Sequence, residues 1–264
     1  MNKKVIIIIA LILVAGISAL AVNKLFFSKN QVSQETTTKK KKIAPPVNII
    51  NVEDRAYVKI SPNSNGHNLT LEVVDVKKKA MTVDYELEYQ AGSLLQGAFG
   101  QIELSAIPAR KDVLLGSCSA GGACTYHEDV QGGSLLLNFD GDEDYGLKSD
   151  WKYIDNKAKE MAFSSRDAKF QIESKDLKTV RYLVIYNSPG FAKGLTGLPV
   201  SDIYNLTGSA DLAGEANLTI RMTEETQGKI MGYDGSKWQE FKTTMEGKEA
   251  TATVKLMESY VVVK

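Results

Sequence analysis

Residues 81–89 read Met-Thr-Val-Asp-Tyr-Glu-Leu-Glu-Tyr, with an apolar side chain at every odd position and a polar side chain at every even position. Because successive side chains of a β-strand point to opposite faces of a sheet, this alternation predicts a half-buried strand with an acidic outer face. Similar alternation recurs over residues 69–73, 218–222 and 250–256. We therefore expect an all-β protein.

A second kind of strand is expected at residues 180–186, which read Val-Arg-Tyr-Leu-Val-Ile-Tyr. This stretch is more uniformly apolar, which favours a central strand that is covered on both faces. Turn-forming pairs such as Gly132-Gly133 and Asp234-Gly235 recur at short intervals along the chain. Many short strands with this spacing are typical of β-sandwiches.

Glycines cluster over residues 188–198, directly after the expected central strand. Because glycine clusters mark loops, we expect a boundary here between two β-sandwich domains. The larger would span residues 47–189 and the smaller residues 190–264. A single continuous sandwich is the alternative.

Residues 5–22 form an apolar segment without a charged side chain. The segment is just long enough for a helix that crosses a bilayer, and only internally hydrogen-bonded structures are stable there. We expect a transmembrane signal anchor, with residues 1–4 as a cytoplasmic tail. The alternative is a secretory signal peptide that is cleaved after Ala21, which would release a secreted protein.

Residues 23–46 are rich in lysine, threonine, serine and glutamine, which indicates a disordered linker. The whole chain carries 32 basic and 32 acidic side chains, but residues 1–46 hold eight lysines and a single acid. The remaining chain is therefore acidic overall. Nucleic-acid binding requires a positive surface, so we expect no nucleic-acid partner.

Cys118 and Cys124 are the only cysteines, and Gly121-Gly122 lies between them. An isolated pair in a chain with an export signal predicts a disulfide and an oxidising compartment. The distribution of lysines opposes a location of the later chain outside the cytoplasm. Positive charge is enriched on the cytoplasmic side of a membrane segment, and more lysines follow the apolar segment than precede it. The lysines nearest to the segment and the cysteine pair favour a single-pass protein of the cell membrane with its C-terminal region outside the cytoplasm.

Asp140, Asp142 and Asp144 place carboxylates at alternate positions, as a calcium-binding loop does. The match then fails, because Tyr145 replaces the glycine of the sixth position and Trp151 replaces the glutamate of the twelfth. A calcium site and an acidic surface turn both remain open. We expect no other cofactor.

The last part of the chain carries a loose motif. Residues 198–206 read LPVSDIYNL, residues 216–220 ANLTI, residues 230–238 IMGYDGSKW, residues 251–254 TATV and residues 260–262 YVV. This order resembles the C-terminal β-sandwich module, similar to ZU5 domains, that recurs at the ends of prokaryotic surface proteins. The resemblance implies an extracellular interaction or structural module without catalytic residues.

Catalytic signatures such as H-E-x-x-H, G-x-S-x-G and the P-loop are absent from the sequence. We expect a membrane-anchored, extracytoplasmic protein that binds an envelope polymer or a surface protein, or has a structural role there, rather than an enzyme. One alternative is a surface enzyme that acts on envelope glycans through carboxylates on strands. Another is a non-catalytic carbohydrate-binding module with an exposed aromatic platform that includes Trp151 or Trp238.

Overall fold

The computed structural model of this protein describes residues 44–264. The expected tail at residues 1–4, the expected membrane segment at residues 5–22 and nearly all of the expected linker lie outside the described residues. Between Ala44 and Lys264 no helix combines the length and the hydropathy that a bilayer-spanning helix needs.

The described part of the chain is built from β-strands, with two short 3-10 helices, η1 (Val52–Asp54) and η2 (Lys175–Thr179). The expectation of an all-β protein is therefore confirmed. The strands are β1 Tyr57–Pro62, β2 Asn68–Asp75, β3 Ala80–Ala91, β4 Leu94–Glu103, β5 Ala109–Leu114, β6 Gly116–Cys118, β7 Cys124–Tyr126, β8 Val130–Gly141, β9 Tyr145–Asp155, β10 Ala162–Ser164, β11 Phe170–Glu173, β12 Tyr182–Ser188, β13 Ile203–Gly208, β14 Glu215–Arg221, β15 Lys229–Tyr233, β16 Trp238–Glu240, β17 Thr244–Glu246, β18 Glu249–Lys255 and β19 Ser259–Val263.

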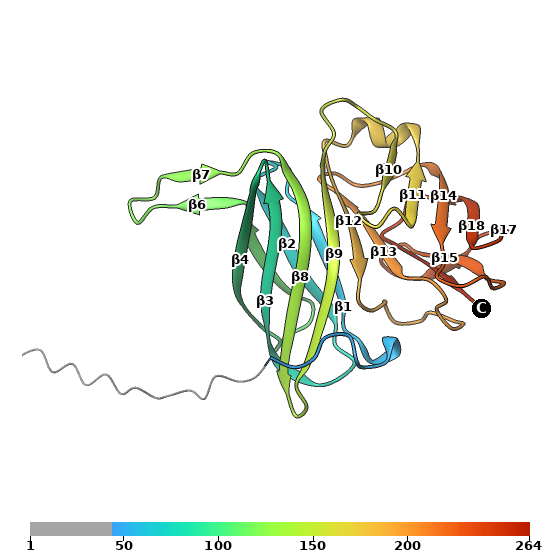
Figure 1. Ribbon diagram of the computed structural model, residues 1–264, viewed down its shortest axis with the longest axis horizontal. Helices are drawn as coiled ribbons and strands as arrows, with labels where there is room; N and C mark the ends of the chain where they lie inside the picture. Colours follow the sequence, from blue (N-terminus) through green and yellow to red (C-terminus); the bar gives the residue numbers. More distant parts are fainter. Residues whose placement is uncertain (1–43) are drawn as a thin grey trace, which may run out of the picture. The chain divides into compact units, whose positions relative to one another are not determined.

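Within residues 44–264 these strands form four sheets (Figure 1). The large sheet has the order β16-β15-β19-β13-β12-β9-β8-β3-β4. The β1 sheet has the order β1-β2-β5, and the β14 sheet has the order β10-β11-β14-β18-β17. Strands β6 and β7 pair only with each other and form what we call the disulfide hairpin.

Strand β3 shows the burial that its alternating sequence predicts. Val83, Tyr85, Leu87 and Tyr89 are at most 4% exposed, and the polar residues between them face outward. The buried set packs against β8 and β9 of the large sheet and against side chains of the β1 sheet. Burial of this one face fixes the register of β3, because a shift by one residue would expose all four side chains.

Strand β12 is buried on both faces, as its uniformly apolar sequence predicts. Val184 and Tyr186 belong to the hydrophobic core under the β1 sheet, while Leu183 and Ile185 belong to the core under the β14 sheet. Because neighbouring residues of a strand point to opposite faces, the two smaller sheets cover opposite faces of the large sheet. Strand β12 is where the two cores meet back to back.

The chain does not divide into two sets of strands near residue 189. The residues on either side of the expected boundary, Ser188 in β12 and Ile203 in β13, are paired neighbours in the large sheet. The β14 sheet likewise combines β10 and β11 from before that point with β14, β17 and β18 from after it. The physical reason is that β12 buries both of its faces. Each of the two smaller sheets packs against one face of this same strand.

Candidate binding surface

The expected disulfide is present. Cys118 and Cys124 are bonded and form the last paired positions of the disulfide hairpin. The hairpin projects away from the sheets in Figure 1, and its residues from Ser117 to Tyr126 are exposed. At its base the ring of Tyr126 stacks on His67, with 3.9 Å between ring centroids. The disulfide therefore shapes an exposed loop and takes no part in a buried core.

Asp142 and Asp144 lie in the turn between β8 and β9, whereas Asp140 is a paired residue near the end of β8. Asp142 pairs with Lys79, and an oxygen of Asp144 accepts a hydrogen bond from the amide of Gly141 at 3.3 Å. In the described part of the chain, no group of three or more histidine, cysteine, aspartate or glutamate side chains is gathered as a metal site would require. Calcium binding stays a prediction that this structure does not test.

Neither tryptophan presents an open ring. Trp151 is 0% exposed and packs in the core with Tyr89. Trp238 is half-buried, and its indole N–H donates a hydrogen bond to the carbonyl of Ala192 at 3.1 Å. Trp151 is thus unable to stack on a glycan, and Trp238 can offer only part of its ring.

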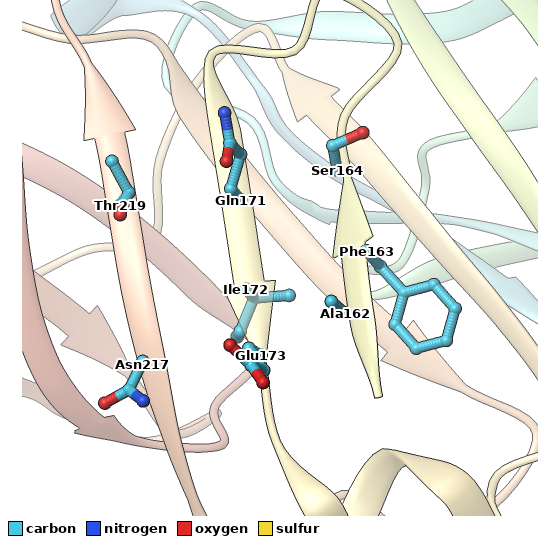
Figure 2. A pocket seen from close by; sticks show the side chains of 8 residues that line it. All are labelled: Ala162, Phe163, Ser164, Gln171, Ile172, Glu173, Asn217 and Thr219. Atoms are coloured by element: carbon cyan, nitrogen blue, oxygen red, sulfur yellow. The ribbon is translucent and has the colours of Figure 1, made fainter. Parts of the chain in front are cut away.

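A small hollow of about 300 Å³ lies over strands β10, β11 and β14 (Figure 2). Its polar lining residues are neighbours in the strand pairing. Ser164, Gln171 and Thr219 lie side by side across the three strands, and Glu173 and Asn217 lie side by side two residues further along β11. Glu173 is the one carboxylate among its lining residues. Glycoside hydrolysis uses two carboxylates that flank the bond to be cleaved, so this hollow does not supply that arrangement.

Strand β4 is the outermost strand of the large sheet and pairs with β3 along ten residues. The other end of the large sheet, β16, has three residues, as do β10 and β17 at the ends of the β14 sheet. In the β1 sheet, strand β5 carries the charged run Arg110-Lys111-Asp112. Short and charged edges resist pairing with other chains, so β4 differs from the other edges of the described sheets.

The remaining edge, β1, is occupied by side chains of the large sheet. The carbonyl of Val58 accepts hydrogen bonds from the Ser188 hydroxyl and the Asn205 amide, at 3.2 and 3.1 Å. The carbonyl of Ile60 accepts one from the Thr207 hydroxyl at 2.7 Å. These contacts satisfy backbone groups that an added strand would otherwise use.

Exposed apolar side chains concentrate on β4. Phe99 is 84% exposed, Leu95 68% and Leu94 62%. The strand carries no proline, and residues 94–102 carry no charge. Native edge strands are usually protected by lysine, proline or a bulge, and β4 has none of these devices. An open and apolar edge of this length is a surface on which an extended polypeptide can add as a further strand.

The outer face beside this edge is acidic and hollowed. Phe99 lies opposite Glu86, and Gly97 lies opposite Glu88, in the pairing of β4 with β3. These four residues, with Asp84, contribute to the lining of an open depression of about 660 Å³. Phe99 and Gly97 both line this depression, and Gly97 brings no side chain into it.

The inner face of β4 is held close to the core by small residues. A Cβ atom added to Gly100 would lie 2.7 Å from the hydroxyl oxygen of Tyr85, so only glycine fits here without a shift of the ring. Burial raises the pKa of the Tyr85 hydroxyl, which keeps this side chain neutral in its apolar setting. At the end of the strand Ile102 is 5% exposed. These contacts fix the position of the edge.

Strand β4 carries only a weak signal in the sequence and was not predicted as a binding edge. Glycines at positions 97 and 100 weaken the strand signal, because glycine has low β-propensity. The available signal was a run of uncharged residues with several apolar side chains directly after a strongly patterned acidic strand, joined to it by Gly92-Ser93.

Comparisons with protein-family models, curated proteins and solved structures give no match to this chain. The resemblance of residues 198–264 to ZU5-like modules therefore stays an expectation from the sequence.

Proposed function

We propose that this protein is a membrane-anchored, extracytoplasmic binding protein that captures an extended polypeptide segment as an additional strand along β4. Residues 5–22 would serve as the anchor, and residues 23–46 as the linker that separates the sheets from the membrane. Cleavage after Ala21 would give a secreted form with the same surface. The two layers over the large sheet would be β-sandwiches of Ig-like or ZU5-like type.

One observation carries this proposal: β4 is long, open and apolar, whereas the other sheet edges between Ala44 and Lys264 are short, charged or occupied. In strand addition the backbone hydrogen bonds supply affinity, and pockets for alternate side chains supply specificity. The depression beside Phe99 and Gly97 offers such a pocket on the outer face.

The carboxylates near this surface favour binding over hydrolysis. Asp84, Glu86 and Glu88 stand in one row on one face of β3. A glycosidase needs its two carboxylates on either side of the scissile bond, and a row on a single flat strand does not enclose a substrate. Asp84 accepts a hydrogen bond from the Gln101 amide at 2.7 Å, and Glu88 accepts one from the Ser134 hydroxyl at 3.1 Å.

Site-specific photo-crosslinking in native membranes tests the proposal. A photoreactive amino acid replaces Phe99 in the full-length chain, and the matched control carries it in place of Ile49, which is 70% exposed and lies outside β4. We expect a discrete polypeptide adduct at position 99 and none at position 49. Equal adduct formation at both positions, or none at either, would contradict strand capture by β4.

The proposed placement needs its own measurement. Protease added to intact cells should degrade the region after residue 46, and the protein should be recovered with the membrane fraction. A fully soluble, protease-protected protein would contradict the placement without bearing on the binding surface.

A further inference from the structure

We infer that the strand which pairs with β4 is β4 of a second copy of this chain. The inference rests on the proposed function, since it names the occupant of the same edge. Two antiparallel copies of one strand are related by a two-fold axis perpendicular to the sheet, and such an axis keeps the outer face of each copy on the same side. Residues that lie opposite each other must therefore come from the same face of β4.

A register centred on Ala98 meets this condition and fits the side chains. It places Phe99 of one copy opposite Gly97 of the other on the outer face. On the inner face it places Leu94 opposite Ile102. The bulkiest exposed ring of the strand thus covers the position that has no side chain, and two apolar residues meet at each end.

The space above Gly97 is open in the isolated chain. A Cβ atom added to Gly97 would meet no closer atom than the carbonyl oxygen of Leu87, at 3.8 Å. An aromatic side chain placed across from a glycine fills such a gap and shields the glycine backbone from water. Because the axis repeats the contact, one pairing covers both exposed Phe99 rings.

The backbone directions agree with the same register. The amide of Leu104 donates to the carbonyl of Met81 on β3, and hydrogen-bonded positions alternate along an antiparallel pair. Even-numbered residues of β4 therefore bond to β3, while Gly97 and Phe99 direct their backbone groups to the open edge. The Gly97–Phe99 pair between copies can then exchange two backbone hydrogen bonds.

Charge does not decide between a second copy and a basic peptide. Residues 94–102 bring no like charges together when two copies pair. Glu86 of one copy would lie three strand spacings, about 14 Å, from Glu88 of the other, which exceeds the screening length of about 8 Å at physiological salt. A foreign basic strand would lie about 10 Å from the same carboxylates, so they would attract it only weakly. The fit of Phe99 over Gly97 is therefore the stronger source of selection.

Cysteine crosslinking of the full-length chain in detergent micelles tests the register. In the Ala98→Cys variant the two introduced thiols would face each other at a position where Cα atoms lie about 4.5 Å apart, which a disulfide can span. The matched control is Gln101→Cys on the same strand, whose thiols would lie about 20 Å apart in this register. We expect a covalent dimer with the first variant and none with the second.

Sedimentation of the full-length Phe99→Ala variant gives a second measurement that does not require a cysteine at the inner face. We expect the dissociation constant of the dimer to rise roughly tenfold, because both copies lose the contact with Gly97. The Ile49→Ala control should leave it unchanged. If Ala98→Cys does not fold, this comparison still decides the matter.

A monomer at every concentration, or equal crosslinking at positions 98 and 101, would overturn the inference. A photo-adduct from position 99 to a different polypeptide, without a dimer, would leave strand capture by β4 intact and reject the second copy as its occupant. Absence of both the adduct and the dimer would reject both proposals.

Discussion

The hydroxyl of Tyr57 donates a hydrogen bond to a carboxylate oxygen of Glu258 at 2.7 Å, although 201 positions separate the two residues. The ammonium of Lys59 binds the other oxygen of Glu258 at 2.9 Å and Glu72 at 3.1 Å, and Arg110 also binds Glu72. Burial, followed by the nearby Glu258 carboxylate, raises the pKa of Tyr57 well above its ordinary value. This polar network fastens the β1 sheet to the segment that precedes β19.

Removal of Glu258 should destabilise the whole sheet assembly. In the Glu258→Ala variant, Tyr57 loses its acceptor and Lys59 keeps only Glu72, so we expect the free energy of unfolding to fall by roughly 1–3 kcal/mol. Urea denaturation measures this loss. The matched control is Glu240→Ala, which removes an exposed pair with Lys229 and should cost less than about 0.5 kcal/mol. Equal effects of the two variants would show that the network contributes no more than a surface ion pair.

Truncation on either face of β12 should weaken the same unfolding transition. Leu183→Ala opens the core under the β14 sheet, and Val184→Ala opens the core under the β1 sheet. We expect losses of roughly 2–4 kcal/mol for the leucine and about half as much for the valine. Tryptophan fluorescence and far-ultraviolet circular dichroism should report one coincident transition in both variants. Separate transitions for the two sets of strands would mean that the cores unfold independently.

Alkaline pH should destabilise the protein through its buried tyrosines. Burial raises the pKa of Tyr186 and Tyr260 above the ordinary value of 10.0, so the folded state holds these protons after the unfolded state has released them. Stability is therefore unaffected below about pH 10 and falls as the pH rises further, by roughly 1.4 kcal/mol per pH unit for each such tyrosine.

Denaturant titrations between about pH 8 and about pH 11 measure this dependence. The Tyr186→Phe variant loses one titrating group together with the hydrogen bond from Ser149, so it should be less stable at neutral pH but show a shallower alkaline slope. An unchanged slope would contradict the assignment of the effect to Tyr186.

Loss of the disulfide should act locally. In the double variant Cys118→Ser, Cys124→Ser, we expect the global free energy of unfolding to change by less than about 0.5 kcal/mol, because residues of the disulfide hairpin contribute to none of the buried cores. The chain-entropy effect of so short a loop, about 2 kcal/mol, should appear only as faster amide exchange at Ser119, which bonds the carbonyl of Ala123. A global loss of about 2 kcal/mol would show that the hairpin folds together with the sheets.

The sequence predicted those features that depend on the face to which a side chain points. Alternation over residues 81–89 predicted the buried set of β3, and the apolar run over residues 180–186 predicted that β12 is covered on both faces. Cys118 and Cys124 were predictable as a disulfide because they are an isolated and closely spaced pair.

The arrangement of strands was less accessible. Alternation shows which face of a strand is buried but not which strand lies beside it, and the pairing of β9 with β12 and of β12 with β13 joins segments on both sides of a glycine-rich loop. The glycine-rich loop suggested a domain boundary, but the large sheet continues from β12 to β13 on either side of it. The burial of Trp151 did have a signal, since Leu147, Trp151 and Tyr153 occupy alternate positions of β9.

Strand β16, at the opposite end of the large sheet from β4, has only three residues, and its Glu240 is engaged by Lys229. A sheet that can pair along one edge strand only is able to bind one further molecule, and the resulting dimer presents no second edge of this kind to a third molecule. Association through β4 would thus close as a pair, whereas two long bare margins would have allowed the sheets to grow into fibres.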